Sequence, residues 1–99
     1  MTYIDEVAAL VRDCLPPEAR PPEDAAALFR IYALLTRAKG KATTAEDVHD
    51  AWSAWMLTVD PTHPALLPFN ALPQETQAQD KPYLEAIHKA ASKLAPHHP

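Results

Sequence analysis

The stretch TTAEDVHDAWSAWMLTV, residues 43–59, carries the clearest helical signal in this 99-residue chain. It opens with a threonine followed three residues later by an acid, and either Thr43 with Glu46 or Thr44 with Asp47 fits the spacing of a capping box. Apolar side chains then recur at helical spacing. The stretch therefore predicts an amphipathic helix, and the Asp-Pro pair that follows ends it because the residue before proline avoids the helical region. Its apolar face comprises Val48, Ala51, Trp52, Trp55, Met56 and Val59.

Two more amphipathic helices are expected upstream. The first covers residues 3–15 and stops at Pro16-Pro17. The second opens with Pro21-Pro22 and Glu23-Asp24, because proline at a helix start costs no hydrogen bond and acids there face the positive end of the dipole. Gly40 is expected to be its C-terminal cap. Their apolar faces comprise Ile4, Val7, Ala8, Leu10, Val11, Cys14 and Leu15 in the first helix, and Ala25, Leu28, Phe29, Ile31, Tyr32 and Leu35 in the second.

Residues 60–73, DPTHPALLPFNALP, contain four prolines among large apolar side chains. A solvent-exposed linker would not carry Leu66, Leu67, Phe69 and Leu72 together, so we expect an ordered corner that packs onto the helices. A helical turn is expected at 73–76. A last helix follows Asp80, with Pro82 in its first turn and Leu84, Ile87, Ala91 and Leu94 at helical spacing.

The composition agrees with a small helical protein. No segment alternates apolar and polar residues with the period of a strand. The chain has eleven prolines and a single glycine, which excludes Gly-rich phosphate-binding loops. We therefore predict one all-α domain over residues 1–99, a compact bundle of four to five helices with a Pro-rich corner at 60–73. It would consist of an N-terminal helical pair (1–42), a second half (43–95) and a frayed tail (96–99).

Net charge and hydropathy limit the classes of partner that the chain is expected to bind. The net charge is −4, and the basic residues near the end of the second helix suit its C-terminal dipole, so no nucleic acid is expected. A helix-turn-helix is disfavoured because the helix that would read DNA begins with acids. No apolar run approaches the roughly 20 residues of a membrane span, and the lone Cys14 forms no internal disulfide. We expect a cytoplasmic protein without a membrane partner.

The residue pattern gives little support for catalytic activity. Cys14 lies on an apolar helix face, where burial as a small hydrophobic side chain is the usual outcome. His49 and His63 lack the spacing of metal ligands, so neither a metal nor a cofactor is expected, and the chain is predicted not to be an enzyme. Trp52 and Trp55 place two large π surfaces on one side of a helix, which suits either core packing or stacking against a planar ligand.

The second half carries a recognisable pattern. Val48, His49 and Trp52 lie on one helix, His63-Pro64-Ala65-Leu66-Leu67-Pro68-Phe69-Asn70-Ala71-Leu72-Pro73 forms the corner, and Asp80 precedes the last helix. Over residues 46–94 the chain resembles the ryanodine receptor repeat domain, in the form of a stand-alone bacterial or phage protein. The corner is the most specific part of this likeness.

The resemblance implies a small helical domain without catalytic machinery. The channel repeats bind adenine nucleotides by sandwiching the base between aromatic residues, and bacterial members are suspected sensors in nucleotide-signalled conflict systems. By this likeness Trp52 would be the stacking aromatic, with His63 and Pro64 forming the corner beside it. The chain lacks the Gly-Trp-x-Tyr-Gly segment of the family, and Lys81 follows Asp80 where the family has arginine.

We therefore expect a non-enzymatic domain that binds an adenine-nucleotide-like molecule by aromatic stacking. The alternative is a protein-interaction or self-assembly module, with a protein partner or a second copy of the chain held by the apolar corner residues Leu66, Leu67 and Phe69. The expected ligand-binding residues are Trp52, Trp55, His49, His63 and Pro64.

Overall fold

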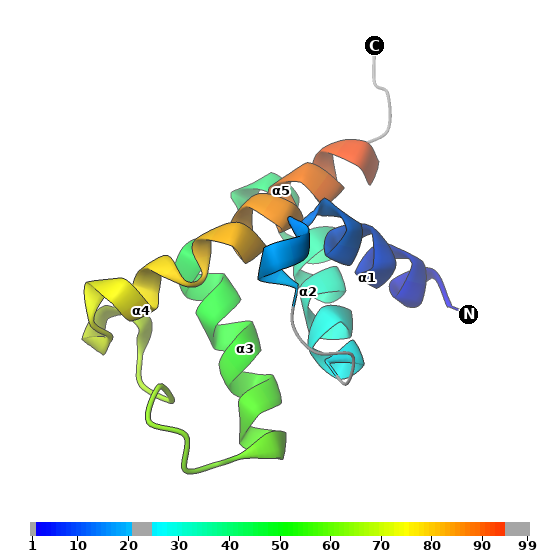
Figure 1. Cartoon of the computed structure of the whole chain (residues 1–99). Helices are drawn as coiled ribbons and strands as arrows, with labels where there is room; N and C mark the ends of the chain where they lie inside the picture. The colour runs from blue at the N-terminus through cyan, green and yellow to red at the C-terminus, as the bar shows by residue number, and fades with distance from the viewer. Residues whose placement is uncertain (1, 21–24, 95–99) are drawn as a thin grey trace.

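The computed structural model describes residues 2–20 and 25–94, and all regular structure in these ranges is helical (Figure 1). Within them, no helix is both long enough and apolar enough to cross a membrane. The predicted all-α bundle of four to five helices is confirmed. The α-helices are α1 (Tyr3–Cys14), α2 (Ala26–Ala38), α3 (Ala45–Val59), α4 (Gln74–Ala78) and α5 (Lys81–Leu94), and single turns of 3-10 helix lie at Pro17–Ala19, Gly40–Ala42 and Phe69–Ala71.

Capping boxes start two of the helices. In α1, Thr2 pairs with Asp5, and in α3 Thr44 pairs with Asp47, which selects the second of the two alternatives. The Asp47 backbone N–H donates to Thr44 Oγ1 at 3.2 Å, and the Thr44 N–H donates to Asp47 Oδ2 at 2.9 Å. Lys39 Nζ lies 2.8 Å from the same carboxylate oxygen. The acid that caps α3 therefore also binds the end of α2.

The start of α2 differs from the prediction. The helix begins at Ala26, not at Pro21-Pro22, and no side chain caps it. Its first hydrogen bond runs from the Phe29 N–H to the Ala25 carbonyl at 3.2 Å. Ala25, the residue before the helix, is buried and has a non-helical backbone. Residues 21–24, which were expected to open the helix, lie outside the described part of the chain.

Gly40 ends α2 as predicted. Lys39 is the C-cap, and Gly40 follows with φ of +55°, in the left-handed region that favours glycine. The Gly40 carbonyl then accepts from the Thr43 N–H at 3.1 Å. This sharp turn allows α3 to begin within a few residues of the end of α2.

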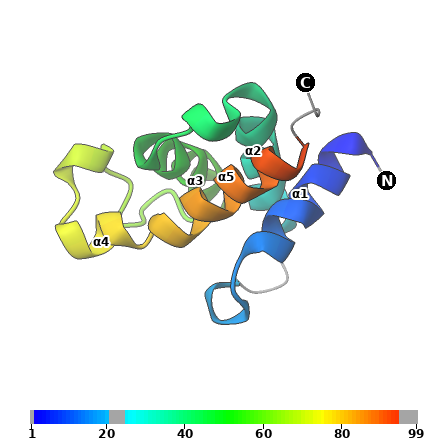
Figure 2. The same cartoon turned by 90° about the horizontal axis from the view of Figure 1, so that it is seen from above.

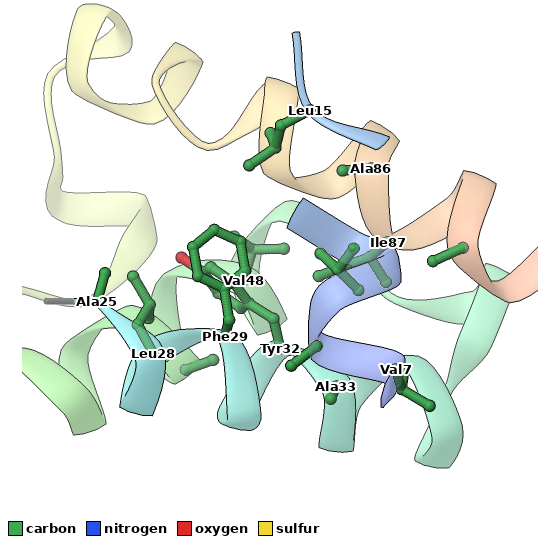
Figure 3. Packing of buried hydrophobic residues seen from close by; sticks show 14 residues of the cluster. Val7, Leu15, Ala25, Leu28, Phe29, Tyr32, Ala33, Val48, Ala86 and Ile87 are labelled. Carbon is green, nitrogen blue, oxygen red and sulfur yellow. The ribbon is translucent and has the colours of Figure 1, made fainter. Parts of the chain in front are cut away.

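The core draws on α1, α2, α3 and α5, so the N-terminal pair and the second half share one hydrophobic cluster. Figure 3 shows Phe29 and Tyr32 pointing from α2 toward α5, where Ile87 points back. The fully buried members include Val11 from α1, Val48 from α3 and Ile87 from α5. Neither half would bury its apolar face alone.

The Pro-rich corner and α4 lie on the opposite side of the molecule from α1 (Figures 1 and 2). The corner is ordered by successive turns, such as those closed by the His63 N–H on the Asp60 carbonyl and by the Leu66 N–H on the His63 carbonyl, both at 3.1 Å. All described peptide bonds are trans. Leu72 is buried and anchors the corner, whereas Leu67 is 47% exposed, contrary to the expectation that it packs.

Two expected core residues at helix ends are exposed. Val59 is 57% exposed and Leu94 is 41% exposed, and each is the last residue of its helix. The core cluster reaches only to Ala51 in α3 and to Ala90 in α5 among fully buried residues. Helical periodicity identified the correct face, but the helices continue past their neighbours.

Candidate functional site

A cavity of about 620 Å³ opens between the start of α2, α3, α4 and the start of α5. This volume lies within the range of roughly 300–1,000 Å³ typical of small-molecule sites. Four of the five expected ligand-binding residues line it, but Pro64 does not and is exposed. The lining residues are Ala19, Ala25, Leu28, Tyr32, His49, Trp52, Trp55, His63, Ala65, Thr76, Gln79, Asp80, Pro82 and Tyr83.

Aromatic rings form the wall contributed by α3 and the corner. Trp52 and Trp55 are both half-buried, so each combines packing on the core with exposure to the cavity. The His49 ring stacks on Trp52 with centroids 5.6 Å apart and planes at 20°. The His63 and Trp52 rings meet edge to face, with centroids 5.1 Å apart and planes at 81°. The wall thus presents flat apolar surface together with two imidazoles.

Backbone groups of the corner orient both imidazoles. His49 Nε2 lies 2.6 Å from the Leu67 carbonyl oxygen, and because a carbonyl only accepts, Nε2 carries the proton of this bond. His63 Nδ1 accepts from the Ala65 N–H at 3.0 Å, which leaves Nε2 to carry the proton of that ring. The Pro-rich corner therefore sets which ring nitrogens of the cavity can donate.

Asp80 is the acidic group of the cavity. Its side chain is 14% exposed, and its Oδ2 atom is buried with no hydrogen-bond partner in the described part of the protein. Oδ2 lies 3.9 Å from His49 Nδ1. Burial raises the pKa of Asp80 to about 6, and the nearby His49 opposes this only in part. A ligand that donates a hydrogen bond to this buried carboxylate would therefore lower its free energy.

Two tyrosines complete the polar end of the cavity. Tyr32 comes from α2 and Tyr83 from α5, with ring centroids 5.5 Å apart. The Tyr83 hydroxyl donates to the Ala19 carbonyl at 3.1 Å. Burial raises the pKa of both hydroxyls, and the nearby Asp80 charge adds to the effect. Both phenols therefore remain neutral at physiological pH.

Sequence reasoning missed Asp80 and both tyrosines as site residues. An acid directly before a helix is typical of a helix start, and Tyr32 falls on an apolar helix face, so neither carries a signal for a cavity. Tyr83 lies in the first turn of α5, next to Pro82, where the pattern indicates only a helix boundary. These side chains meet only because α2 and α5 pack together.

The cavity offers no cationic partner for phosphate. None of the described residues that line it is Lys or Arg, and its ionisable side chains are Asp80, the two histidines and the two tyrosines. The described ranges also hold no group of three or more His, Cys, Asp or Glu side chains arranged for a metal ion. Its described polar groups are therefore one carboxyl, two imidazoles, three hydroxyls, the Gln79 amide and two indole N–H groups, with no Lys or Arg among them.

The apolar corner residues expected to mediate self-assembly, Leu66, Leu67 and Phe69, do not form one exposed patch. Phe69 is half-buried with its ring 6.2 Å from His49, and Leu66 is half-buried as well. Leu67 alone of the three is exposed. The apolar side chains of the corner serve mainly to support the cavity wall.

Comparison with known proteins places the chain in a family without assigning it an activity. The sequence model of a domain of unknown function, DUF7701, matches residues 2–92. Comparison with curated proteins and with solved structures found no match. The matched range spans α1 through nearly all of α5, so both halves of the bundle and the whole cavity lie within it. The chain belongs to the DUF7701 family.

Proposed function

We propose that this protein is a binding module that takes a planar heteroaromatic molecule of nucleobase type into the cavity. The observation that carries the proposal is the pair of half-buried tryptophans on a cavity of about 620 Å³ that also holds Asp80, whose Oδ2 atom has no hydrogen-bond partner among the described residues. An apolar pocket with a few convergent polar groups is the usual form of a small-molecule site. Stacking of a base on an aromatic side chain contributes roughly 1–3 kcal/mol.

The cavity favours the base of a nucleotide over its phosphates. The sequence led us to expect an adenine-nucleotide-like ligand, and the aromatic wall suits such a base. Phosphate groups bind to Arg, Lys or helix N-termini; no Arg or Lys lines the described cavity, and the helix start that α5 presents there is preceded by the acid Asp80. We therefore propose that any phosphates lie outside the cavity and add little to the affinity. The resemblance to the ryanodine receptor repeat, and the sensing role that it implies, stay predictions.

Tryptophan fluorescence tests the proposal directly, because Trp52 and Trp55 are the two tryptophans of the chain. The full chain would be titrated with adenosine and guanosine and with their 5′-triphosphates. We expect a saturable change in fluorescence, an increase in melting temperature, and similar dissociation constants for each nucleoside and its triphosphate. Absence of both a saturable signal and a thermal shift across this panel would refute the proposal.

Self-assembly through Leu66, Leu67 and Phe69 stays the alternative prediction. Only Leu67 of this set is exposed, which gives a small apolar contact area. Sedimentation across a wide concentration range tests it. A dimer that Leu67→Ser dissociates would support the alternative, and a monomer at every concentration would refute self-assembly.

A further inference from the structure

Two hydrogen-bond acceptors lie side by side at the polar end of the cavity. Asp80 Oδ2 and His49 Nδ1 are 3.9 Å apart, and both residues line the cavity. The proton of His49 is on Nε2, where it is bonded to the Leu67 carbonyl. In the neutral ring Nδ1 is therefore a lone-pair acceptor that faces the carboxylate.

The described protein does not supply a donor to Asp80 Oδ2, which is buried without a partner. The Tyr83 hydroxyl, from the same end of α5, is already committed to the Ala19 carbonyl. A buried acceptor without a partner costs free energy, and the cost is greater for a charged one. A ligand that brings N–H groups to this end would remove that cost.

Resting on the proposed function of the cavity, we propose that it selects its ligand by a donor–donor edge: two adjacent N–H groups in the plane of a heteroaromatic ring, as guanine presents at N1 and N2. Asp80 accepts from one N–H group and His49 Nδ1 from the other, while the ring lies against the tryptophan wall. Adenine presents a donor beside an acceptor on the matching edge, so its ring nitrogen would face the carboxylate.

This arrangement predicts strong discrimination. A site that hydrogen-bonds a ligand rejects an analogue that lacks the donor, because the buried acceptor is then left unpaired. A hydrogen bond to a charged group is worth roughly 1.5–3 kcal/mol, which corresponds to an affinity ratio of about tenfold or more.

The test compares guanosine, inosine and adenosine, which share a ribose and differ at the base edge. Dissociation constants would be measured by tryptophan fluorescence and calorimetry on the full chain near pH 7.5. We expect guanosine to bind most tightly, inosine about tenfold more weakly because it lacks the N2 amino group, and adenosine most weakly. Asp80→Asn keeps the shape of the side chain and removes its charge. This variant should weaken guanosine binding at least tenfold and reduce the difference in affinity between guanosine and adenosine.

The exposed Asp50 supplies a matched control, since Asp50→Asn makes the same chemical change on α3 outside the cavity. This variant should leave all three affinities unchanged, and melting curves should show that both variants fold. Equal affinities for the three nucleosides, tighter binding of adenosine, or unchanged guanosine binding in Asp80→Asn would overturn the donor–donor edge while leaving the cavity a base-binding site. Failure of every nucleoside to bind would overturn the proposed function as well.

Discussion

His49 Nδ1 and the buried Oδ2 of Asp80 lie 3.9 Å apart at the polar end of the cavity, although one residue comes from α3 and the other directly precedes α5. The Leu67 carbonyl, 2.6 Å from His49 Nε2, holds the ring proton on the far side. In the neutral form of the ring, the Nδ1 lone pair therefore faces the Asp80 carboxyl. A proton on Asp80 or a donor from a ligand would make this contact favourable. The protonation of Asp80 is therefore expected to affect both the stability of the fold and the binding of a ligand.

We expect Asp80→Asn to make the protein more stable than the wild type at neutral pH. Burial raises the pKa of the folded carboxyl from 3.8 to about 6, so between these values the folded state binds more protons than the unfolded state. The stability that Asp80 contributes at low pH is therefore lost as the pH rises through this window. Urea unfolding at about pH 4.5, 6 and 7.5 measures the effect.

Asparagine does not titrate, so the difference in unfolding free energy between Asp80→Asn and the wild type should grow as the pH rises toward 7.5. Asp50→Asn, on the exposed face of α3, should show no such trend. Asp5 and Asp47 have pKa values lowered by hydrogen bonds from Arg30 and Lys39, so they titrate below this window. A wild type that gains stability relative to Asp80→Asn across the window would contradict the prediction.

The preference for guanosine over adenosine should shrink when the pH is lowered from about 7.5 to 5. Burial raises the pKa of Asp80 to about 6, and protonated Asp80 presents an O–H donor, which suits the ring nitrogen of adenine. Tyr32 from α2 and Tyr83 from α5 also face this group and stay neutral, because burial raises the pKa of both hydroxyls. Calorimetric titration at both pH values gives the ratio of affinities, and a ratio that does not change with pH would argue against Asp80 as the selecting group.

Trp52→Leu should weaken base binding by about fivefold or more, because base stacking on an aromatic ring contributes roughly 1–3 kcal/mol. Trp52→Phe keeps a flat aromatic face in the same place and should retain most of the affinity. Calorimetry is the appropriate measurement, since both changes remove a fluorophore. Equal affinities of the leucine and phenylalanine variants would show that Trp52 does not stack on the ligand.

Gly40→Ala should destabilise the fold by about 1 kcal/mol, which corresponds to a decrease in melting temperature of about 4–8 °C. A methyl group there would lie 3.7 Å from the Ala91 Cβ, an ordinary van der Waals distance, so the cost arises from the backbone φ of +55° alone. Gly40→Asn should lose less stability than Gly40→Ala, because asparagine tolerates the left-handed conformation better than alanine does. Equal stability of Gly40→Ala and the wild type in thermal unfolding would disprove this account.

Local signals predicted much of the fold. The threonine–acid spacing located the start of α3, Gly40 located the end of α2, and Asp80 with Pro82 located the start of α5. These signals act within a few residues, so they survive in the folded protein. The described helix α2 begins at Ala26, next to the buried Ala25, and the Pro21-Pro22 and Glu23-Asp24 signal that was expected to open it lies outside the described residues.

The site was predictable only in part. Trp52, Trp55, His49 and His63 are chemically distinctive and lie on one helix face or on the adjoining corner, and all four line the cavity. Pro64 shares the corner but is exposed and does not line the cavity, because the turns of the corner, and not the sequence motif, decide which of its residues reach the cavity.

By itself the sequence determined the helical class, most helix boundaries and the aromatic side of the site, because capping, proline geometry and helical periodicity are properties of short segments. Only the tertiary structure decided that Asp80, Tyr32 and Tyr83 would join that aromatic wall. Packing of α5 against α2 and α3 buries a carboxyl that the sequence marks merely as a helix start. Burial raises the pKa of this carboxyl and leaves its Oδ2 atom without a donor among the described residues. Desolvation is a property of the assembled bundle and has no counterpart in a local pattern.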